Sequence, residues 1–276
     1  MTYQRPTQSS SISAVLADGL GLYRAGIRSL YVPAFCLLLV IGLIQWGQIP
    51  YPHIEENAIP DAGHWLRFFA TFVVSMFMFG VVIAIVHYIA SGAPSGVRSP
   101  IAIATRRFPV VLAVSVPYAL AISIGPLVLV LLVGLSALLD LPAILATLAF
   151  FFMMLVTLVP MMYLAIALFA SFIVAIAEGR GPFESLRESF GLVRGHWWRT
   201  FALLAIITAA ATLISLGTNE VILFLADRFD GKPVANTVSA LAYAAIYGIF
   251  WPLSACLMYG VYQDLRLRRN DVAPTT

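Results

Sequence analysis

Long runs of apolar residues, separated by short charged segments, dominate the pattern along the chain. A hydrocarbon core of about 30 Å requires roughly 20 apolar residues of helix, and six runs meet or approach this length. They cover residues 31–49, 65–90, 109–139, 141–177, 198–225 and 237–262. Because the runs lack the alternation typical of barrel strands, helices are the expected spanning element. The pattern predicts an all-α polytopic membrane protein with six transmembrane helices, in a single integral membrane domain over residues 1–276.

The third and fourth runs are longer than a simple span requires. A continuous helix over residues 141–177 would extend about 55 Å at 1.5 Å per residue. We therefore expect the hairpin of these two runs, which turns at Asp140, Leu141 and Pro142, to tilt, kink or project from the bilayer. Pro160 marks the expected kink, because proline lacks the N–H of a helical hydrogen bond.

The composition narrows the class of function. Hydrophobic residues make up 61% of the chain and charged residues 11%, which excludes a soluble globular domain, where about a quarter of the residues are charged. The four His, two Cys and thirteen acids are dispersed, without the spacing of a metal site or of a nucleophile with its base. We therefore expect no enzymatic activity, no cofactor and no metal site.

The connecting segments differ in charge between the two sides of the membrane. An even number of spans puts both termini on one side, together with residues 91–107, 178–199 and the tail 264–276. This side has thirteen Arg and six acids, whereas the opposite loops have three basic and seven acidic residues. The positive-inside rule therefore predicts that both termini are cytoplasmic. Because the net charge of +3 comes from membrane-flanking Arg residues, nucleic acid is not an expected partner.

Two segments on the positive side are too polar to insert, and we predict amphipathic helices in the headgroup plane over residues 10–29 and 182–195. In the second, Pro182 occupies the first helical position. Apolar side chains recur there at three- and four-residue spacing, and they are Phe183, Leu186, Phe190, Val193 and Trp197. We assign three charged residues to the opposite face: Arg187, Glu188 and Arg194.

An internal repeat is suggested by these polar segments. Residues 16–24 match residues 186–194 at an offset of 170, with Leu, Gly, Leu and Arg at equivalent positions. A weaker copy lies around residues 102–111. The matches favour three repeated units, each an interfacial helix followed by a hairpin of spans. The alternative is that amphipathic helices before membrane spans resemble one another by composition alone.

Small residues recur on the last run at four-residue steps. They are Ala240, Ala244 and Gly248 before Pro252, and Cys256 and Gly260 after it. Small side chains let helix backbones approach closely. Because a four-residue step drifts about 40° around a helix, we expect two packing patches rather than one stripe.

Five charged residues on the cytoplasmic side are the candidate site for binding or for holding the structure together: Glu178, Arg187, Arg194, Asp264 and Arg266. Glu178 and Asp264 each end a span, at the depth where an unpaired acid is costly. Arg can hold a carboxylate with two hydrogen bonds. We predict that at least one of these acids pairs with an Arg of the 182–195 helix or of the tail. The alternative is that the arginines contact only phospholipid headgroups.

Two motifs carry a resemblance to a known family. The first is A-E-G-x-G-P-x-E-S-L-R-x-S-F-x-L-V-R-G-x-W over residues 177–197, and the second is Y-x-D-L-R-x-R over residues 262–268. The chain resembles the YciC-like family of bacterial inner-membrane proteins and is similar to the membrane domain attached to some glycerophosphodiester phosphodiesterases. The resemblance implies a bacterial cytoplasmic-membrane protein without a settled biochemical role. Residues 1–276 hold no soluble domain, so the phosphodiesterase activity is not expected.

Two functions agree with these patterns. The first is a non-enzymatic membrane protein that binds a protein partner or organises membrane lipids through a cytoplasmic collar of interfacial helices. The concentration of charge and motif residues on that side favours it. The second is a transporter of a lipid or amphipathic small molecule, with a cavity between the repeated hairpins. The repeat and the long central hairpin favour this alternative.

Overall fold

The computed structural model describes residues 10–46, 62–92, 98–139, 142–229 and 234–272, together with Tyr3, Pro6 and Gln8. These residues form helices and no strands. The helices are α1 (Ile12–Trp46), α2 (Ala62–Ala90), α3 (Arg98–Leu138), α4 (Ala143–Leu168), α5 (Ser171–Ala177), α6 (Pro182–Val193), α7 (Trp197–Arg228) and α8 (Ala235–Val272). Within this described part of the chain, six helical stretches are long and apolar enough to cross a membrane. The predicted fold class, an all-α multi-pass membrane protein, is confirmed.

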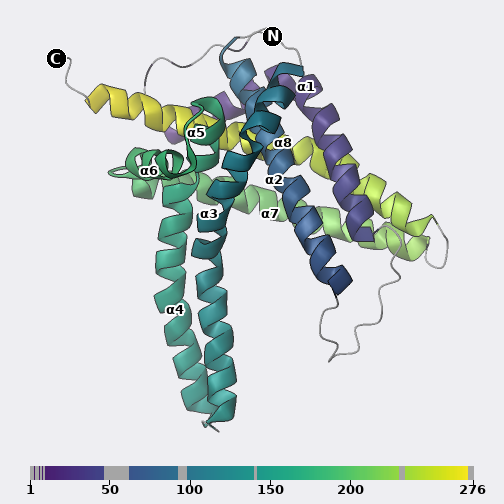
Figure 1. Cartoon of the computed structure of the whole chain (residues 1–276), viewed down its shortest axis with the longest axis vertical. Helices are drawn as coiled ribbons and strands as arrows, with labels where there is room; N and C mark the ends of the chain where they lie inside the picture. The colour runs from purple at the N-terminus through teal and green to yellow at the C-terminus, as the bar shows by residue number, and fades with distance from the viewer. Residues whose placement is uncertain are drawn as a thin grey trace.

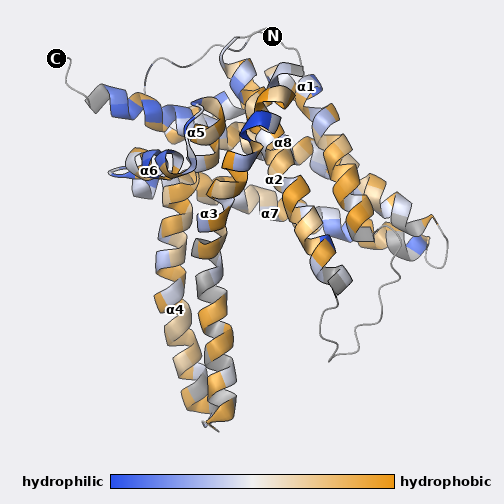
Figure 2. Ribbon diagram, in the orientation of Figure 1, coloured by the Kyte–Doolittle hydropathy of each residue, from blue (hydrophilic) through white to orange (hydrophobic). Residues whose placement is uncertain are grey.

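The helices meet at one end and diverge toward the other (Figure 1). The hairpin of α3 and α4 projects well beyond the remaining helices, and α7 and α8 run in a different direction from it. Helix α2 lies between α1 and α3. Most hydrophilic residues gather where the helices meet, on α6, on the last turns of α8 and near the start of α3 (Figure 2). We call this region the charged end. The apolar lengths of the helices lead away from it.

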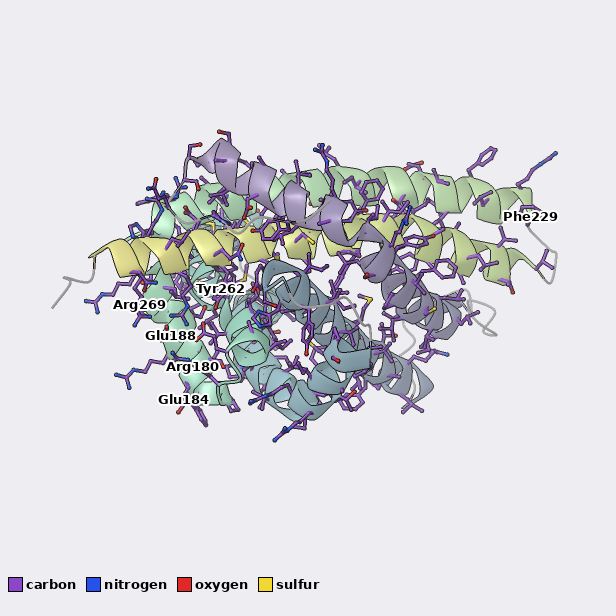
Figure 3. The ribbon with its side chains drawn as sticks, turned by 90° about the horizontal axis from the view of Figure 1, so that it is seen from above. Arg180, Glu184, Glu188, Phe229, Tyr262 and Arg269 are labelled. Carbon is purple, nitrogen blue, oxygen red and sulfur yellow. The ribbon has the colours of Figure 1, made fainter. Side chains whose placement is uncertain are left out.

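The first predicted interfacial helix and the first span form one element. The prediction separated residues 10–29 from residues 31–49, but α1 is continuous from Ile12 to Trp46. Pro33 lies inside α1 and removes one helical hydrogen bond without ending the helix. The chain instead changes direction within α1 (Figure 3). The helical hydrogen bonds therefore continue where the sequence pattern changes from polar to apolar.

The proposed repeat units differ at this junction. Like α1, α3 starts in the polar segment, at Arg98, and continues into its span without a break. Only in the third unit do two helices form, α6 and α7, and the backbone between them includes Gly195 at a positive φ of 86°. This left-handed conformation suits glycine and ends a helix. The threefold repeat remains a prediction.

The interruption of the fourth run is not at Pro160, where the kink was predicted. Helix α4 includes Pro160 and ends at Leu168. After Phe169 and Ala170, the seven-residue helix α5 begins, and the hydroxyl of Ser171 donates a hydrogen bond to the carbonyl of Leu168 at 2.5 Å. Residues Ser171 to Ile176 of α5 are all buried. The prediction of a hairpin turn at Asp140 and Leu141 falls outside the described residues.

Small residues bring α1 and α8 into close contact. A Cβ atom added at Gly42 would lie 3.1 Å from the Cβ of Ala240, and one added at Gly19 would lie 3.2 Å from the carbonyl oxygen of Cys256. Ala240 and Cys256 are fully buried. A Cβ at Gly260 would similarly meet α1, at 3.2 Å from the carbonyl oxygen of Val15. The close helix contact predicted for the last run is present, but both predicted patches face α1.

Gly19 and Gly21 provide a matched test of this packing. A Cβ at position 19 would lie 2.8 Å from the Cα of Leu257, whereas one at position 21 would meet nothing within 4 Å. We expect Gly19→Ala to lower the free energy of unfolding by about 1–3 kcal/mol, because backbone must move. Gly21→Ala should raise it by up to about 1 kcal/mol through helix propensity. Thermal denaturation in detergent measures both, and equal shifts in one direction would contradict the packing.

Candidate functional site

Helix α6 lies beside the end of α4 that is far from the turn of the α3–α4 hairpin. In Figure 1 it is seen nearly end-on, while α3 and α4 run vertically. Pro182 is its first residue, where a missing N–H costs no helical hydrogen bond. The preceding N–H, of Gly181, is held by the carboxylate of Glu184 at 3.4 Å. The buried hydroxyl of Ser189 donates to the carbonyl of Ala167 at 2.7 Å, which attaches α6 to α4.

The faces of α6 differ from the prediction. The buried residues are Ser185, Glu188, Ser189, Leu192 and Val193. The exposed face also includes Glu184 and Gly191, and its aromatic and cationic side chains form what we call the α6 stripe: Phe183, Arg187, Phe190 and Arg194. Positions i, i+4, i+7 and i+11 lie on one side of an α-helix. The assignment of Arg187 and Arg194 to the face opposite Phe183 was therefore wrong, and Glu188 points into the protein because its ion-pair partners lie there.

Glu178, at the end of α5, is surrounded by three donors. The Nε of Arg180 donates to its carboxylate at 2.9 Å and the hydroxyl of Tyr262 at 2.6 Å. The guanidinium of Arg266 also donates to it. The Glu178 side chain is only 18% exposed. Tyr262 and Arg266 belong to α8, so these contacts connect the end of α5 to the last helix.

Glu188 of α6 shares the same cations. Its carboxylate lies 3.3 Å from the Nη1 of Arg180 and 2.8 Å from the Nη1 of Arg266, and it accepts a further hydrogen bond from Arg269. Arg180 and Arg266 therefore each contact both Glu178 and Glu188. We call these five residues the Glu178 network; Figure 3 labels Arg180, Glu188 and Arg269 together with the neighbouring Tyr262. The planar guanidinium, with donors on several edges, can connect two carboxylates in this way.

The pKa of Glu178 carries a testable consequence. Burial opposes its ionisation, but hydrogen bonds from Tyr262 and Arg266 and the charges of Arg266 and Arg180 outweigh burial, so the pKa lies below the ordinary value of 4.5. A depressed pKa gives stabilisation that is complete above pH 4.5 and is lost as the pH falls through the folded-state pKa.

We therefore expect the melting temperature in detergent to fall more steeply below pH 4.5 in the wild type than in Glu178→Gln. Glu178→Gln removes the carboxylate at this position, so the difference between the two pH profiles reports on Glu178 and its ion pairs. Thermal unfolding between pH 3 and pH 7 measures it, over a window set by the usual carboxylate pKa values of about 4. Parallel profiles would contradict the assigned role.

Asp264 of α8 forms a second cluster around the backbone of Ser10. One carboxylate oxygen accepts from the Ser10 amide at 3.0 Å, and the other from the Nε of Arg199 at 3.1 Å and of Arg268 at 3.0 Å. Both arginines also donate to the Ser10 carbonyl oxygen. The Asp264 side chain is 3% exposed. We call these four residues the Asp264 clamp, which joins the segment before α1 to the start of α7 and to α8.

The structure brings together some of the predicted site residues. Glu178 pairs with Arg266, and Asp264 pairs with Arg268. Both arginines belong to the predicted tail, and the prediction required such a pair for at least one of the two acids. Arg187 and Arg194 are exposed, and neither forms an ion pair within the described part of the chain. The acid Glu188, rather than an arginine, connects α6 to the tail.

Sequence reasoning missed four other partners, which are Ser10, Arg180, Glu188 and Arg199, and it predicted a tail arginine without singling out Arg268. Asp264 and Arg268 have the i, i+4 spacing of a helical ion pair, which was an available signal. Arg180, two residues after Glu178, was another. The contact with Ser10 has no local signal, because 254 residues separate it from Asp264.

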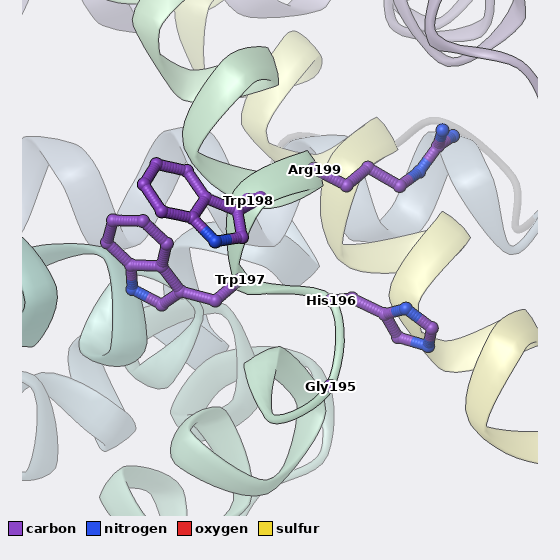
Figure 4. Close-up of a pocket in the computed structure, with 5 residues that line it drawn as sticks. All are labelled: Gly195, His196, Trp197, Trp198 and Arg199. Atoms are coloured by element: carbon purple, nitrogen blue, oxygen red, sulfur yellow. The ribbon is translucent and has the colours of Figure 1, made fainter.

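An open pocket of about 410 Å³ lies at the turn that leads into α7, lined by Gly195, His196, Trp197, Trp198 and Arg199. The two indoles lie on one side and the His196 and Arg199 side chains extend to the other (Figure 4). Trp197 stacks on Tyr163 with ring centroids 5.7 Å apart, whereas Trp198 is 75% exposed. Arg199 already belongs to the Asp264 clamp. The pocket therefore presents chiefly aromatic surface beside α6.

One family matches most of the chain. The model of a domain of unknown function, DUF7847, covers residues 24–262. The chain belongs to the DUF7847 family. No curated protein and no solved structure matches it significantly.

The family match supports a membrane protein from an uncharacterised family, and it does not support the YciC-like assignment suggested by the motifs. The matched residues include Glu178 and Glu188 but end before Asp264 and Arg266. Among the described residues, no group of three or more His, Cys, Asp or Glu side chains is arranged to hold a metal ion.

Proposed function

We propose that this protein is a non-enzymatic bacterial inner-membrane protein that organises anionic lipid through its charged end. The observation that carries the proposal is the α6 stripe, in which Phe183 is 84% and Phe190 40% exposed beside Arg187 and Arg194. Aromatic rings favour the membrane interface, and arginine favours phosphate. A stripe with both is suited to the headgroup layer.

The rigid attachment of α6 supports this function. Glu188 and Ser189 hold its inner face to α8 and α4, so the outward direction of the stripe does not depend on lipid. The arginines of the stripe are not used for ion pairs among the described residues. They are therefore available to several headgroups at once.

The charge distribution supports an orientation in which the charged end and both termini face the cytoplasm. Reporter domains fused after Thr276 and inserted at Phe229 should lie on opposite sides of the inner membrane, because one span, α8, separates these positions. A reporter active only in the cytoplasm tests this. Two reporters on the same side would overturn the topology.

Lipid retention tests the function itself. The double variant Arg187→Gln/Arg194→Gln should lose most of the enrichment of phosphatidylglycerol over zwitterionic lipid that co-purifies in mild detergent, as measured by mass spectrometry. A control with the same charge change away from the charged end is Arg67→Gln/Arg228→Gln. Equal enrichment in the two variants would overturn the proposal. A third outcome is possible, in which neither protein enriches lipid, but a second protein co-purifies with the wild type and not with the stripe variant. This outcome would show that the α6 stripe binds a protein partner instead of lipid.

The alternative, a transporter of a lipid or amphipathic molecule, is favoured by the divergence of the α3–α4 hairpin from α7 and α8 (Figure 1). Apolar side chains remain exposed on these helices, including Leu131, Phe152 and Leu213 at 63%, 63% and 71%. Reconstitution into liposomes with a fluorescent phospholipid distinguishes the two functions. Faster exchange between leaflets in the presence of the protein would favour the transporter.

A further inference from the structure

Arg107 of α3 differs from the arginines around it at the charged end. Arg180, Arg266 and Arg269 all pair with Glu178 or Glu188. Arg107 is half-buried, yet it forms no ion pair or hydrogen bond with the described residues. A partly buried charge without a partner is costly, because it has lost water without gaining a counter-charge. Its position therefore indicates a ligand that is an anion.

Gly179 provides the space in which the Arg107 side chain lies. A Cβ atom at position 179 would be 2.5 Å from the Nη2 and 3.2 Å from the Cζ of Arg107. Gly179 also has a positive φ of 67°, a conformation that favours glycine. Any side chain here would displace the guanidinium. The Arg107 guanidinium therefore lies against the backbone at Gly179, which is between Glu178 and Arg180 in the chain.

The local charge is positive. Four arginines, namely Arg107, Arg180, Arg266 and Arg269, lie with three carboxylates, those of Glu178, Glu188 and Glu184. The side chain of Arg180 is 40% exposed, and Arg180 follows Gly179 directly in the chain. A guanidinium group without a carboxylate partner, in a region of excess positive charge, is suited to bind a phosphate group.

We propose that Arg107, Gly179 and Arg180 form a binding site for one phosphate group at the charged end, with Arg107 as the principal contact. The phosphate belongs to an anionic phospholipid headgroup or to a free phosphate compound, since both present the same oxygens. The site rests on the proposed function in one respect, namely that the charged end takes anionic lipid. The α6 stripe offers an extended surface for headgroups, and the Arg107 site adds one defined binding position for a phosphate group.

Native mass spectrometry of the full chain in detergent tests the site with phosphatidylglycerol as the probe. The wild type should retain one tightly bound lipid, and Arg107→Gln should weaken that binding at least tenfold. Arg106→Gln is the matched control, because Arg106 is the adjacent exposed arginine on the same helix. It should bind within about twofold of the wild type, since surface substitutions are usually nearly neutral. Arg107→Lys keeps the positive charge but lacks the planar guanidinium, so its affinity for phosphatidylglycerol should lie between those of the wild type and Arg107→Gln.

A second arm replaces the lipid by inorganic phosphate. Displacement of the bound phosphatidylglycerol by millimolar phosphate would identify a free phosphate compound as the natural source, whereas its persistence would identify the lipid headgroup. Equal binding by Arg107→Gln and Arg106→Gln would overturn the site. If the α6 stripe variants lose lipid enrichment while Arg107→Gln does not, the site fails and the proposed function stands. If Arg107→Gln loses lipid binding while the α6 stripe variants keep their lipid enrichment, the Arg107 site is supported and the proposed role of the stripe fails.

Discussion

Replacing Asp264 with Asn is expected to lower the free energy of unfolding by about 3 kcal/mol, because removal of one partner from a buried ion pair leaves the other charges uncompensated. Asp264 is 3% exposed and accepts hydrogen bonds from Arg199, Arg268 and the Ser10 amide. Asn removes the negative charge from a site that contains two arginines. Thermal and chemical denaturation in detergent measure the loss.

The same substitution should release the segment before α1. The Ser10 amide donates to Asp264, so its hydrogen exchange should be faster in Asp264→Asn than in the wild type. Arg194→Gln is the control, because Arg194 is exposed and forms no ion pair with the described residues. Its stability should change by less than about 0.5 kcal/mol. Unchanged exchange at Ser10 would contradict the clamp, even if the overall stability fell.

Arg266→Gln is expected to lower the free energy of unfolding by about 2 kcal/mol, somewhat less than a fully buried pair would, because Arg266 is 23% exposed. Arg266 contacts both Glu178 and Glu188, so its loss weakens two ion pairs at once. Arg266→Lys should recover only part of the stability, because an ammonium group cannot connect two carboxylates as a guanidinium does. Thermal unfolding in detergent ranks the three proteins.

A double-mutant cycle provides the sharper comparison. Arg266→Gln and Glu188→Gln should be strongly non-additive, with a coupling energy of about 1 kcal/mol, because the two side chains are 2.8 Å apart. Arg187→Gln is the matched control, an exposed arginine on the same helix as Glu188. It should be additive with Arg266→Gln to within about 0.5 kcal/mol. Additivity in both cycles would show that Arg266 acts only as a surface charge.

The fold class followed from hydropathy because six runs approach or exceed the roughly 20 apolar residues that a membrane-spanning helix requires. Helix ends were less predictable. The pattern changes from polar to apolar near Tyr31, but α1 is continuous there, since helical hydrogen bonds do not depend on hydropathy. The interruption after Leu168 arises where α5 packs among neighbouring helices, and Pro160, the local signal, is accommodated within α4.

The candidate site was predictable in part. A carboxylate at the end of a span requires a partner, and this argument found Glu178, Asp264 and Arg266. The orientation of α6 was not accessible, because apolar periodicity identifies a lipid-facing side as readily as a protein-facing one. Phe183 thus faces outward while Glu188 is buried. Contacts between residues distant in sequence, such as Ser10 with Asp264, depend on the complete fold.

The pairing of α1 with α8 has a consequence for biosynthesis. At roughly 5–20 residues per second, α8 leaves the ribosome about 10–40 s after α1. During this time α1 resides in the membrane with the backbone at Gly19 and Gly42 uncovered, since Leu257 and Ala240 have not yet been made. The contact between α1 and α8 therefore forms only after nearly the whole chain has been made, whereas α1 can pack against α2 long before.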